Sequence, residues 1–120
     1  MIVEDDFDIR NLVQMMFSKD PEFTIIGVAE SAEEVLEMLK LKDVRLIVLD
    51  HGLTGELTGI EMAPRFKEIA PQAKIILFTA DPTLQDRVAR EPAIDAFLVK
   101  TNLRQLLPTA RRLCGLGMPQ

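Results

Sequence analysis

The feature that most constrains the fold of this chain is a short apolar run that ends abruptly at a carboxylate. Residues 45–50 read Arg-Leu-Ile-Val-Leu-Asp, and two of the apolar residues are β-branched. Such a run is typical of a strand that is buried on both faces, as in a parallel sheet. Because ligands bind at the carboxyl ends of the strands in open α/β sheets, Asp50 lies where a reactive group is expected.

Strand and helix patterns alternate along the rest of the chain. Strands are expected at residues 1–3, 23–29, 46–50, 74–79 and 96–100. Each is followed by a helical pattern, at residues 7–19, 31–39, 59–70, 81–90 and 102–113. Five strands that alternate with five helices predict one α/β domain, a doubly wound parallel sheet with helices on both faces. We expect this domain to span residues 1–114, with residues 115–120 a tail or the start of a linker.

Local signals mark where several of these helices begin. Asp6 or Asp8 is suited to cap the first helix, and the stretch Ser31–Glu34 has the pattern of a capping box. Asp81–Pro82 places a cap before a proline at the first helical position. Two helices are predicted to be irregular because each contains a proline, Pro64 or Pro108.

Charge and cysteine content exclude several classes of function. Fourteen Lys and Arg against nineteen Asp and Glu leave a net charge of −5, which argues against a nucleic-acid-binding surface. The single cysteine, Cys114, rules out an internal disulfide and suits a reducing compartment. No apolar run reaches the roughly 18 residues of a membrane span, and no export leader is evident. We therefore expect a cytoplasmic protein with no membrane contact.

Four of the five expected strands end in polar groups, which predicts a single site. These groups are Glu4-Asp5-Asp6, Asp50, Thr79 and Lys100. In a doubly wound sheet of order 2-1-3-4-5 the four strands are neighbours, so the groups converge at one edge. Each has an ordinary explanation, since acidic triplets usually cap helices, threonine packs well and lysine favours the surface. These separate explanations do not account for the presence of all four polar groups at the same edge of the sheet.

The residue types in this group suit phosphoryl chemistry on a magnesium site. Two carboxylates about 4 Å apart repel by roughly 4 kcal/mol at an effective dielectric constant of about 20, and a hard cation relieves that repulsion. Oxygen ligands from Glu4, Asp5 and Asp50 favour Mg²⁺ over Zn²⁺. With Thr79 and Lys100 to contact phosphoryl oxygens, Asp50 is the candidate nucleophile.

Five stretches in register resemble the receiver domain of two-component response regulators. They are residues 2–6 (Ile-Val-Glu-Asp-Asp) with Arg10, residues 46–50, residues 59–61 (Gly-Ile-Glu), residues 75–80 (Ile-Ile-Leu-Phe-Thr-Ala) and residues 96–100 (Ala-Phe-Leu-Val-Lys). The resemblance covers essentially the whole chain. It implies the flavodoxin-like fold with strand order 2-1-3-4-5.

The resemblance also implies a role for each matching residue. Asp50 matches the phosphoacceptor, Asp5 the direct metal ligand and Glu4 a neighbour that often acts through water. The Gly52 carbonyl matches the remaining protein ligand of the Mg²⁺ ion.

Other matching positions concern the switch and the lifetime of the phosphoryl group. Thr79 matches the hydroxyl that turns toward the phosphoryl group, Lys100 the ammonium that contacts it, and Phe97 the aromatic switch. Gly52 and Asp81 match positions that tune autodephosphorylation, although helix capping is the simpler role for Asp81.

Three features depart from the family pattern, and one neighbour of the acceptor invites a second interpretation. Thr54 replaces a usual proline, the loop before Gly59 is one residue longer than typical, and Thr101 replaces the proline after Lys100, which predicts a different presentation of that lysine. His51 is interpreted as a solvated loop residue rather than a catalytic one.

The leading hypothesis is a phosphorylation-switched signalling module. It takes a phosphoryl group from a histidine kinase or phosphotransfer protein, catalyses only its own phosphorylation and dephosphorylation, and then binds a protein target or an output domain. A homodimer is also compatible with this hypothesis.

Two alternatives stay open on the sequence alone. One is a phosphorylation-independent receiver that serves as a docking or dimerisation module, which millimolar Mg²⁺ binding would distinguish. The other is an enzyme on the same fold, such as a flavin carrier or an aspartyl-phosphate phosphatase. This chain speaks against such an enzyme, because it has no phosphate-binding loop after the first strand and no second aspartate two residues after Asp50.

Overall fold

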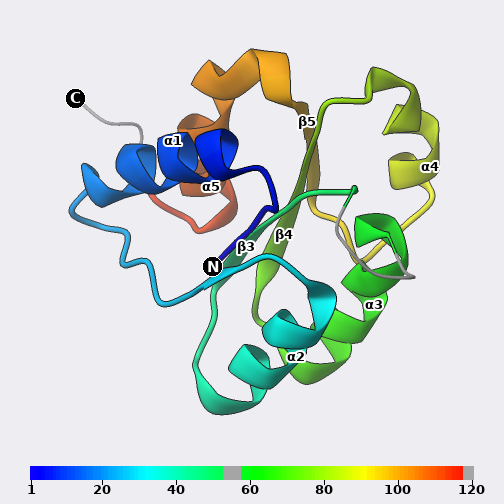
Figure 1. Ribbon diagram of the computed structural model, residues 1–120, viewed down its shortest axis with the longest axis horizontal. Coiled ribbons are helices and arrows are strands. Elements are labelled where there is room, and N and C mark those ends of the chain that lie inside the picture. Colours follow the sequence, from blue (N-terminus) through cyan, green and yellow to red (C-terminus); the bar gives the residue numbers. More distant parts are fainter. Residues whose placement is uncertain (53–57, 118–120) are drawn as a thin grey trace.

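A five-stranded parallel sheet forms the centre of the computed structural model, which describes residues 1–52 and 58–117 (Figure 1). The strands are β1 (Ile2–Val3), β2 (Val28–Ala29), β3 (Leu46–Leu49), β4 (Lys74–Thr79) and β5 (Ala96–Val99). The helices are α1 (Phe7–Ser18), α2 (Ala32–Leu41), α3 (Gly59–Ile69), α4 (Gln85–Ala89) and α5 (Leu106–Leu113), with 3₁₀ segments η1 (Pro82–Leu84) and η2 (Lys100–Gln105). The sheet order is β2-β1-β3-β4-β5 and every pairing is parallel, which confirms the predicted topology.

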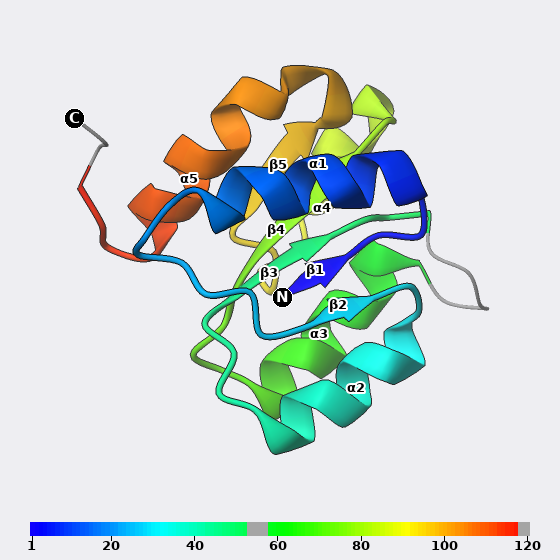
Figure 2. The ribbon, with the colours of Figure 1, turned by 60° about the vertical axis from the view of Figure 1, so that its left-hand side comes forward.

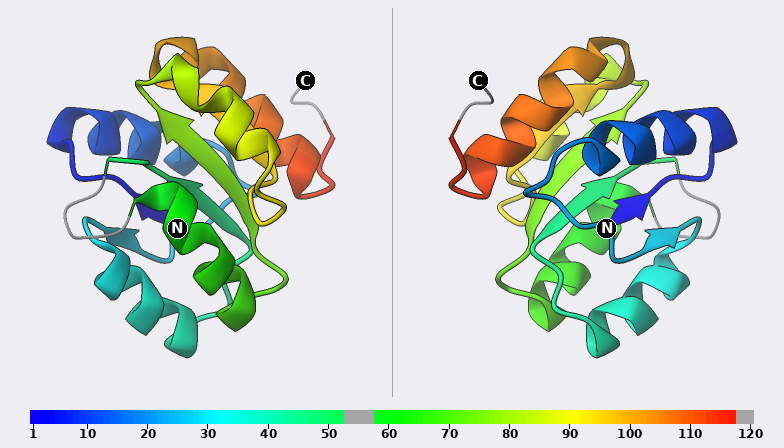
Figure 3. Two further views of the ribbon diagram at one scale, coloured as in Figure 1. Left: turned by 90° about the vertical axis from the view of Figure 1, so that its right-hand side faces the viewer. Right: turned by 90° about the vertical axis from the view of Figure 1, so that its left-hand side faces the viewer.

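Each face of the sheet is covered by its own set of helices. Helices α1 and α5 lie over one face, and α2, α3 and α4 lie over the other (Figures 2 and 3). Side chains of β3 alternate between the two cores: Leu46 and Val48 pack in the first, Ile47 and Leu49 in the second. All four residues are buried, which confirms the prediction of a strand that is buried on both faces.

Helix caps follow the predicted residues in most places. Asp6 caps α1, because its Oδ1 accepts hydrogen bonds from the backbone N–H groups of Asp8 and Ile9. Ser31 Oγ caps α2 by accepting from the Glu34 N–H. The reciprocal half of that predicted capping box is wrong, because the Glu34 carboxylate accepts from the Glu30 N–H instead.

A complete capping box starts α3, although the sequence interpretation did not include it. Thr58 Oγ1 accepts from the Glu61 N–H, and the Glu61 carboxylate accepts from the Thr58 N–H. The signal was present in the sequence as threonine followed three residues later by glutamate. Pro64 lies inside this helix, as expected.

The second strand and the last helix are shorter than predicted. Strand β2 pairs only at Val28 and Ala29, because the two-residue β1 offers a partner to those positions alone. Helix α5 starts at Leu106, which places Pro108 in its first turn, where the missing N–H has no helical partner to lose. The preceding residues form the 3₁₀ segment η2, with a kink at Asn102. Within residues 1–52 and 58–117, no helix has both the length and the apolar character that crossing a membrane requires.

Candidate functional site

The sheet hydrogen bonds hold two acidic residues side by side at the carboxyl ends of β1 and β3. Val3 lies opposite Leu49 in the register, so the residues that follow them, Glu4 and Asp50, are adjacent. The Asp50 N–H donates to the Val3 carbonyl at 2.9 Å, and the Glu4 N–H donates to the Ala29 carbonyl at 3.0 Å. Both backbones are therefore fixed by strand pairing rather than by a loop.

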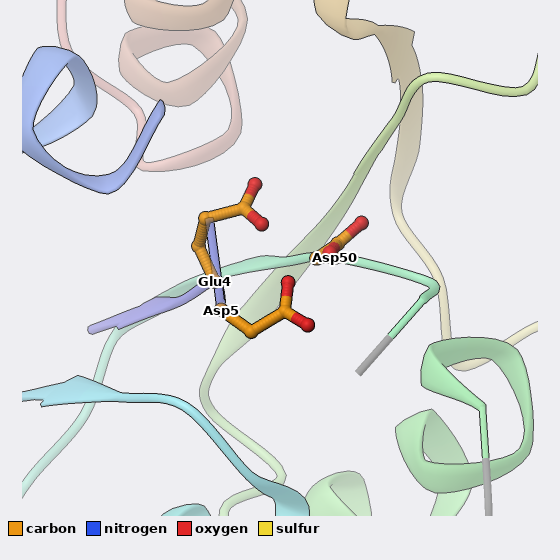
Figure 4. A group of neighbouring side chains, drawn as sticks. All are labelled: Glu4, Asp5 and Asp50. Carbon is orange, nitrogen blue, oxygen red and sulfur yellow. The ribbon is translucent and has the colours of Figure 1, made fainter. Parts of the chain in front are cut away.

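Three carboxylates gather at this edge of the sheet (Figure 4). One oxygen from each of Glu4, Asp5 and Asp50 lies within 4.8 Å of the others. Glu4 and Asp50 are buried, with 3% and 6% of their surface exposed, whereas Asp5 is exposed to solvent. Asp5 thus faces water, whereas Glu4 and Asp50 are shielded from it. Because like charges that are shielded from water repel strongly, they need a nearby cation.

Lys100 supplies positive charge to the buried pair. Its Nζ lies 2.7 Å from Glu4 Oε1 and 3.4 Å from Asp50 Oδ1. Burial alone would lower the pKa of this ammonium, but the hydrogen bond to Glu4 and the charge of Asp50 outweigh burial, and the pKa is raised. The lysine therefore stays charged and enters the site although Thr101, not proline, follows it.

Glu4 is the residue whose protonation is most perturbed. Burial raises its pKa to about 7, and the neighbouring Asp50 adds to the rise, while the hydrogen bond from Lys100 opposes it. A carboxyl with a raised pKa stabilises the fold fully below its unfolded value, about pH 4.3, and loses that contribution as the pH rises through about 7.

Metal-free protein is therefore expected to lose stability as the pH rises from about 4 to about 7. The loss reaches up to about 3–4 kcal/mol at roughly 1.4 kcal/mol per pKa unit, and Mg²⁺ affinity rises over the same range because metal binding displaces the Glu4 proton. Chemical denaturation and Mg²⁺ titration at each pH measure both effects. A Glu4→Gln variant is the matched control and gives a flatter profile; an equal slope in that variant would contradict the assignment to Glu4.

The other predicted residues lie around this cluster in different ways. Thr79 ends β4 and is buried, and its hydroxyl accepts a hydrogen bond from the Asp81 N–H at 3.2 Å. Asp81 caps η1: its Oδ1 accepts from the Thr83 N–H at 2.9 Å and from the Thr83 hydroxyl at 2.6 Å. Phe97 is half-buried and packs against the core beneath α2, α3 and α4.

Two glycines near the acceptor have very different surroundings. A Cβ on Gly59 would lie 2.5 Å from the Asp50 carbonyl oxygen and 3.0 Å from the His51 Cα, so α3 begins in direct contact with the acceptor backbone. A Cβ on Gly52 would meet no atom of the described residues within 4 Å. The sequence interpretation assigned a role to Gly52 and none to Gly59, because close backbone approach leaves no signal in a single sequence.

His51 differs from its predicted environment. The residue is half-buried, not fully solvated, and among the described residues its Nδ1 is buried without a hydrogen-bond partner. Burial and the charge of Arg87 lower its pKa, although the charges of Asp50, Asp81 and Glu61 oppose them. The predicted peculiarities at Thr54 and in the longer loop fall in residues 53–57, outside the described residues.

The donor set fits a magnesium ion. Three carboxylates supply only oxygen ligands, carry more negative charge than Lys100 balances, and leave Asp5 open to water. Mg²⁺ prefers such sites, in which it keeps several waters and takes one or two carboxylates. Soft-metal ligands are absent from this group, which argues against zinc.

Comparisons with known proteins point in one direction. A family model of the response regulator receiver domain matches residues 1–111. The nitrate/nitrite response regulator protein NarL of Escherichia coli is 27% identical over 101 residues, which are 83% of this chain and 46% of NarL. Sensory transduction protein LytR of Staphylococcus haemolyticus is 31% identical over 106 residues, 88% of this chain and 41% of LytR. The chain thus spans less than half the length of these two relatives.

Solved structures give the same result. Response regulator protein TrrA from Thermotoga maritima, crystallised in complex with Mg²⁺-BeF, has a TM-score of 0.81 at 28% identity. The match covers 93% of this chain and 95% of the TrrA chain. A CheY-like response regulator receiver domain protein from Methanospirillum hungatei shares the fold, with a TM-score of 0.82 at 24% identity. The match covers 95% of this chain and 90% of the Methanospirillum chain.

Proposed function

The chain belongs to the response regulator receiver domain family of two-component systems, and on this premise we propose that it accepts a phosphoryl group on Asp50 in the presence of Mg²⁺. The observation that supports this most strongly is the meeting of Glu4, Asp5, Asp50 and Lys100 at one sheet edge. Three carboxylates beside one half-buried lysine leave an excess of negative charge, which destabilises the fold unless a cation balances it.

The reaction is a displacement at phosphorus with Asp50 as the nucleophile. A carboxylate oxygen of Asp50 forms the new P–O bond while the bond from phosphorus to the donor breaks, and the donor leaves with that electron pair. The product is an acyl phosphate on Asp50. Asp50 is buried, with 6% of its surface exposed, so the donor reaches it through that small exposed part.

The neighbouring residues are proposed to hold the ion and the phosphoryl oxygens. Asp5, Asp50 and the Gly52 carbonyl are assigned as protein ligands of Mg²⁺, with Glu4 beside them. When bound, the ion neutralises charge that develops on the phosphoryl oxygens. Lys100, already placed on Glu4 and Asp50, donates to a phosphoryl oxygen once Asp50 carries that group.

The response to phosphorylation is proposed to pass through β4 and β5. The Thr79 hydroxyl, which now accepts from the Asp81 N–H, is assigned to turn toward the phosphoryl group. Phe97 lies on the adjacent strand, where Leu77 and Phe97 are paired in the register. We assign it to fill the space that Thr79 leaves. Gly52 and Asp81 are assigned to tune the lifetime of the acyl phosphate.

The partners follow from the family and from the length of the relatives. We propose that a histidine kinase or phosphotransfer protein in the cytoplasm donates the phosphoryl group. We further propose that the domain spans residues 1–114 and that residues 115–120 lead toward an output domain or a separate protein target. Its own catalysis is limited to self-phosphorylation and self-dephosphorylation in this proposal.

Incubation with acetyl phosphate tests the proposal. With millimolar Mg²⁺, the intact mass is expected to increase by one phosphoryl group, and EDTA is expected to suppress the increase because the carboxylate cluster then repels the anionic donor. Unchanged mass, together with no Mg²⁺ binding at millimolar concentration, would overturn the proposal in favour of a phosphorylation-independent docking module.

A further inference from the structure

Arg10, at the end of the first turn of α1, is a charged side chain to which the proposed site gives no role. Only 14% of this side chain is exposed. Its Nη1 donates to Glu30 Oε1 at 2.7 Å and to the backbone carbonyl of Glu4 at 3.3 Å. Its guanidinium carbon lies 5.6 Å from the centre of the Phe7 ring. Contacts with three segments of the chain, after β1, after β2 and in α1, therefore fix one guanidinium group.

The carbonyl that Arg10 contacts belongs to the peptide group that joins Glu4 to Asp5. Because a peptide group is planar, a hydrogen bond to its oxygen restrains the whole plane and the direction in which the chain enters Asp5. The Glu4 N–H donates to the Ala29 carbonyl at 3.0 Å, and the Asp6 N–H donates to the Glu4 carboxylate at 3.2 Å. These two bonds fix the residues on either side of Asp5, and the Arg10 contact adds the orientation of the peptide between them.

Asp5 depends on its backbone more than the other two carboxylates of the cluster do. Glu4 and Asp50 are buried and held by their surroundings, whereas Asp5 is exposed. Figure 4 shows the side chains of Glu4 and Asp5 leaving consecutive residues in different directions, with Asp50 beside them. An ion that binds a mobile carboxylate must also offset the entropy lost when that side chain becomes ordered. A fixed backbone at Asp5 therefore favours binding of the ion.

We propose that Arg10 is a positioning residue of the Mg²⁺ site, which holds the Glu4 carbonyl and so keeps the Asp5 carboxylate in place to bind the ion. This inference rests on the proposed function, because that function assigns Asp5 as a ligand of Mg²⁺. Groups that hold metal ligands in place typically change metal affinity by about 10- to 100-fold when they are removed. The contact is to a backbone oxygen, so Arg10 acts on the binding of the ion and not on phosphoryl transfer once the ion is bound.

The charge of Arg10 and its positioning role have opposite effects on Mg²⁺ affinity. A positive charge beside the cluster repels a cation, so removal of the charge alone would strengthen Mg²⁺ binding. Loss of the contact with the Glu4 carbonyl would weaken it. The ion pair with Glu30 contributes little to stability, because the Glu30 side chain is 60% exposed. The direction of the change in Mg²⁺ affinity therefore distinguishes the two roles.

The variant Arg10→Met, which retains an apolar stem but loses the charge and the donors, tests this inference. In a Mg²⁺ titration followed by amide chemical shifts, its Kd for Mg²⁺ is expected to rise about tenfold. In metal-free protein, the NMR order parameter of the Asp5 amide is expected to fall. Arg10→Lys, which retains the charge and an ammonium donor, is expected to recover part of the affinity. Arg112→Met removes the same charge from an exposed side chain in the last turn of α5, and its Kd is expected within about twofold of the parent value.

Phosphoryl uptake separates this role from a general loss of structure. At saturating Mg²⁺, Arg10→Met is expected to take up phosphoryl groups from acetyl phosphate at the parent rate, with Tm within about 5 °C of the parent. Slower uptake at saturating Mg²⁺ together with a larger fall in Tm would overturn the inference in favour of a structural role. Mg²⁺ affinity in Arg10→Met equal to or above that of the parent would also overturn it.

The same measurements distinguish a failure of this inference from a failure of the proposed function. A parent chain that binds Mg²⁺ but gains no phosphoryl mass contradicts phosphorylation of Asp50, and the Mg²⁺ affinity of Arg10→Met then still decides the role of Arg10. A parent chain that binds no Mg²⁺ at millimolar concentration overturns both.

Discussion

The variant Asp50→Asn is expected to lose phosphoryl uptake from acetyl phosphate completely, as read by intact mass. An amide oxygen carries no full negative charge, so the proposed nucleophile is removed while the shape of the side chain is kept. The fold is expected to survive, because one of the charges that raise the pKa of Glu4 is also removed. In metal-free buffer at pH 8, its free energy of unfolding should equal or exceed that of the parent chain.

A second variant separates loss of the acceptor from loss of the metal site. Asp5→Asn retains Asp50 but removes an exposed carboxylate from the cluster, so Mg²⁺ affinity falls and phosphoryl uptake slows without vanishing at high Mg²⁺.

Uptake by Asp50→Asn at the rate of the parent chain would show that the phosphoryl group goes elsewhere.

The substitution Gly59→Ala is expected to have the largest effect of any single methyl addition near the site. The new Cβ would lie 2.5 Å from the Asp50 carbonyl oxygen and 3.1 Å from its carbonyl carbon, both backbone atoms. Relief of this overlap requires α3 or the end of β3 to move, at a cost of about 1–3 kcal/mol in the free energy of unfolding. Denaturant unfolding measures the cost, and phosphoryl uptake falls because Asp50 is displaced.

Gly52→Ala provides the matched control for that experiment. It adds the same methyl group seven residues earlier, in the same connection between β3 and α3, where the added atom meets no atom within 4 Å in residues 1–52 and 58–117. A stability change within about 0.5 kcal/mol is expected for this variant. Equal losses in the two variants would contradict the steric explanation.

Those features that depend on local pattern could be predicted from the sequence. The apolar run at residues 46–49 predicted a strand buried on both faces. Asp6 and Asp81 marked the starts of helices, because aspartate is a preferred N-cap residue. The strand order came from a family resemblance, since alternation of strands and helices alone leaves several orders open. Strand ends then placed Glu4 and Asp50 at one edge, because parallel strands bring their carboxyl ends together.

Features that depend on spatial neighbours could not be predicted in this way. The length of β2 is set by how many residues β1 offers as partners, which its own β-rich sequence does not encode. The Glu34 carboxylate had two backbone N–H groups within reach, and only the fold selects that of Glu30. Likewise the need for glycine at position 59 arises from contact with Asp50, nine residues away.

The central claim concerns which atom receives the phosphoryl group, and borohydride reduction tests it most directly. Acyl phosphates are reduced by borohydride to the alcohol, so a phosphorylated aspartate becomes homoserine in a peptide digest. After treatment with acetyl phosphate and Mg²⁺, homoserine is expected at position 50 and at no other carboxylate of the cluster. Homoserine at position 5, the reduced glutamate 2-amino-5-hydroxypentanoic acid at position 4, or no reduced residue in a chain that has gained phosphoryl mass, would contradict Asp50 as the acceptor.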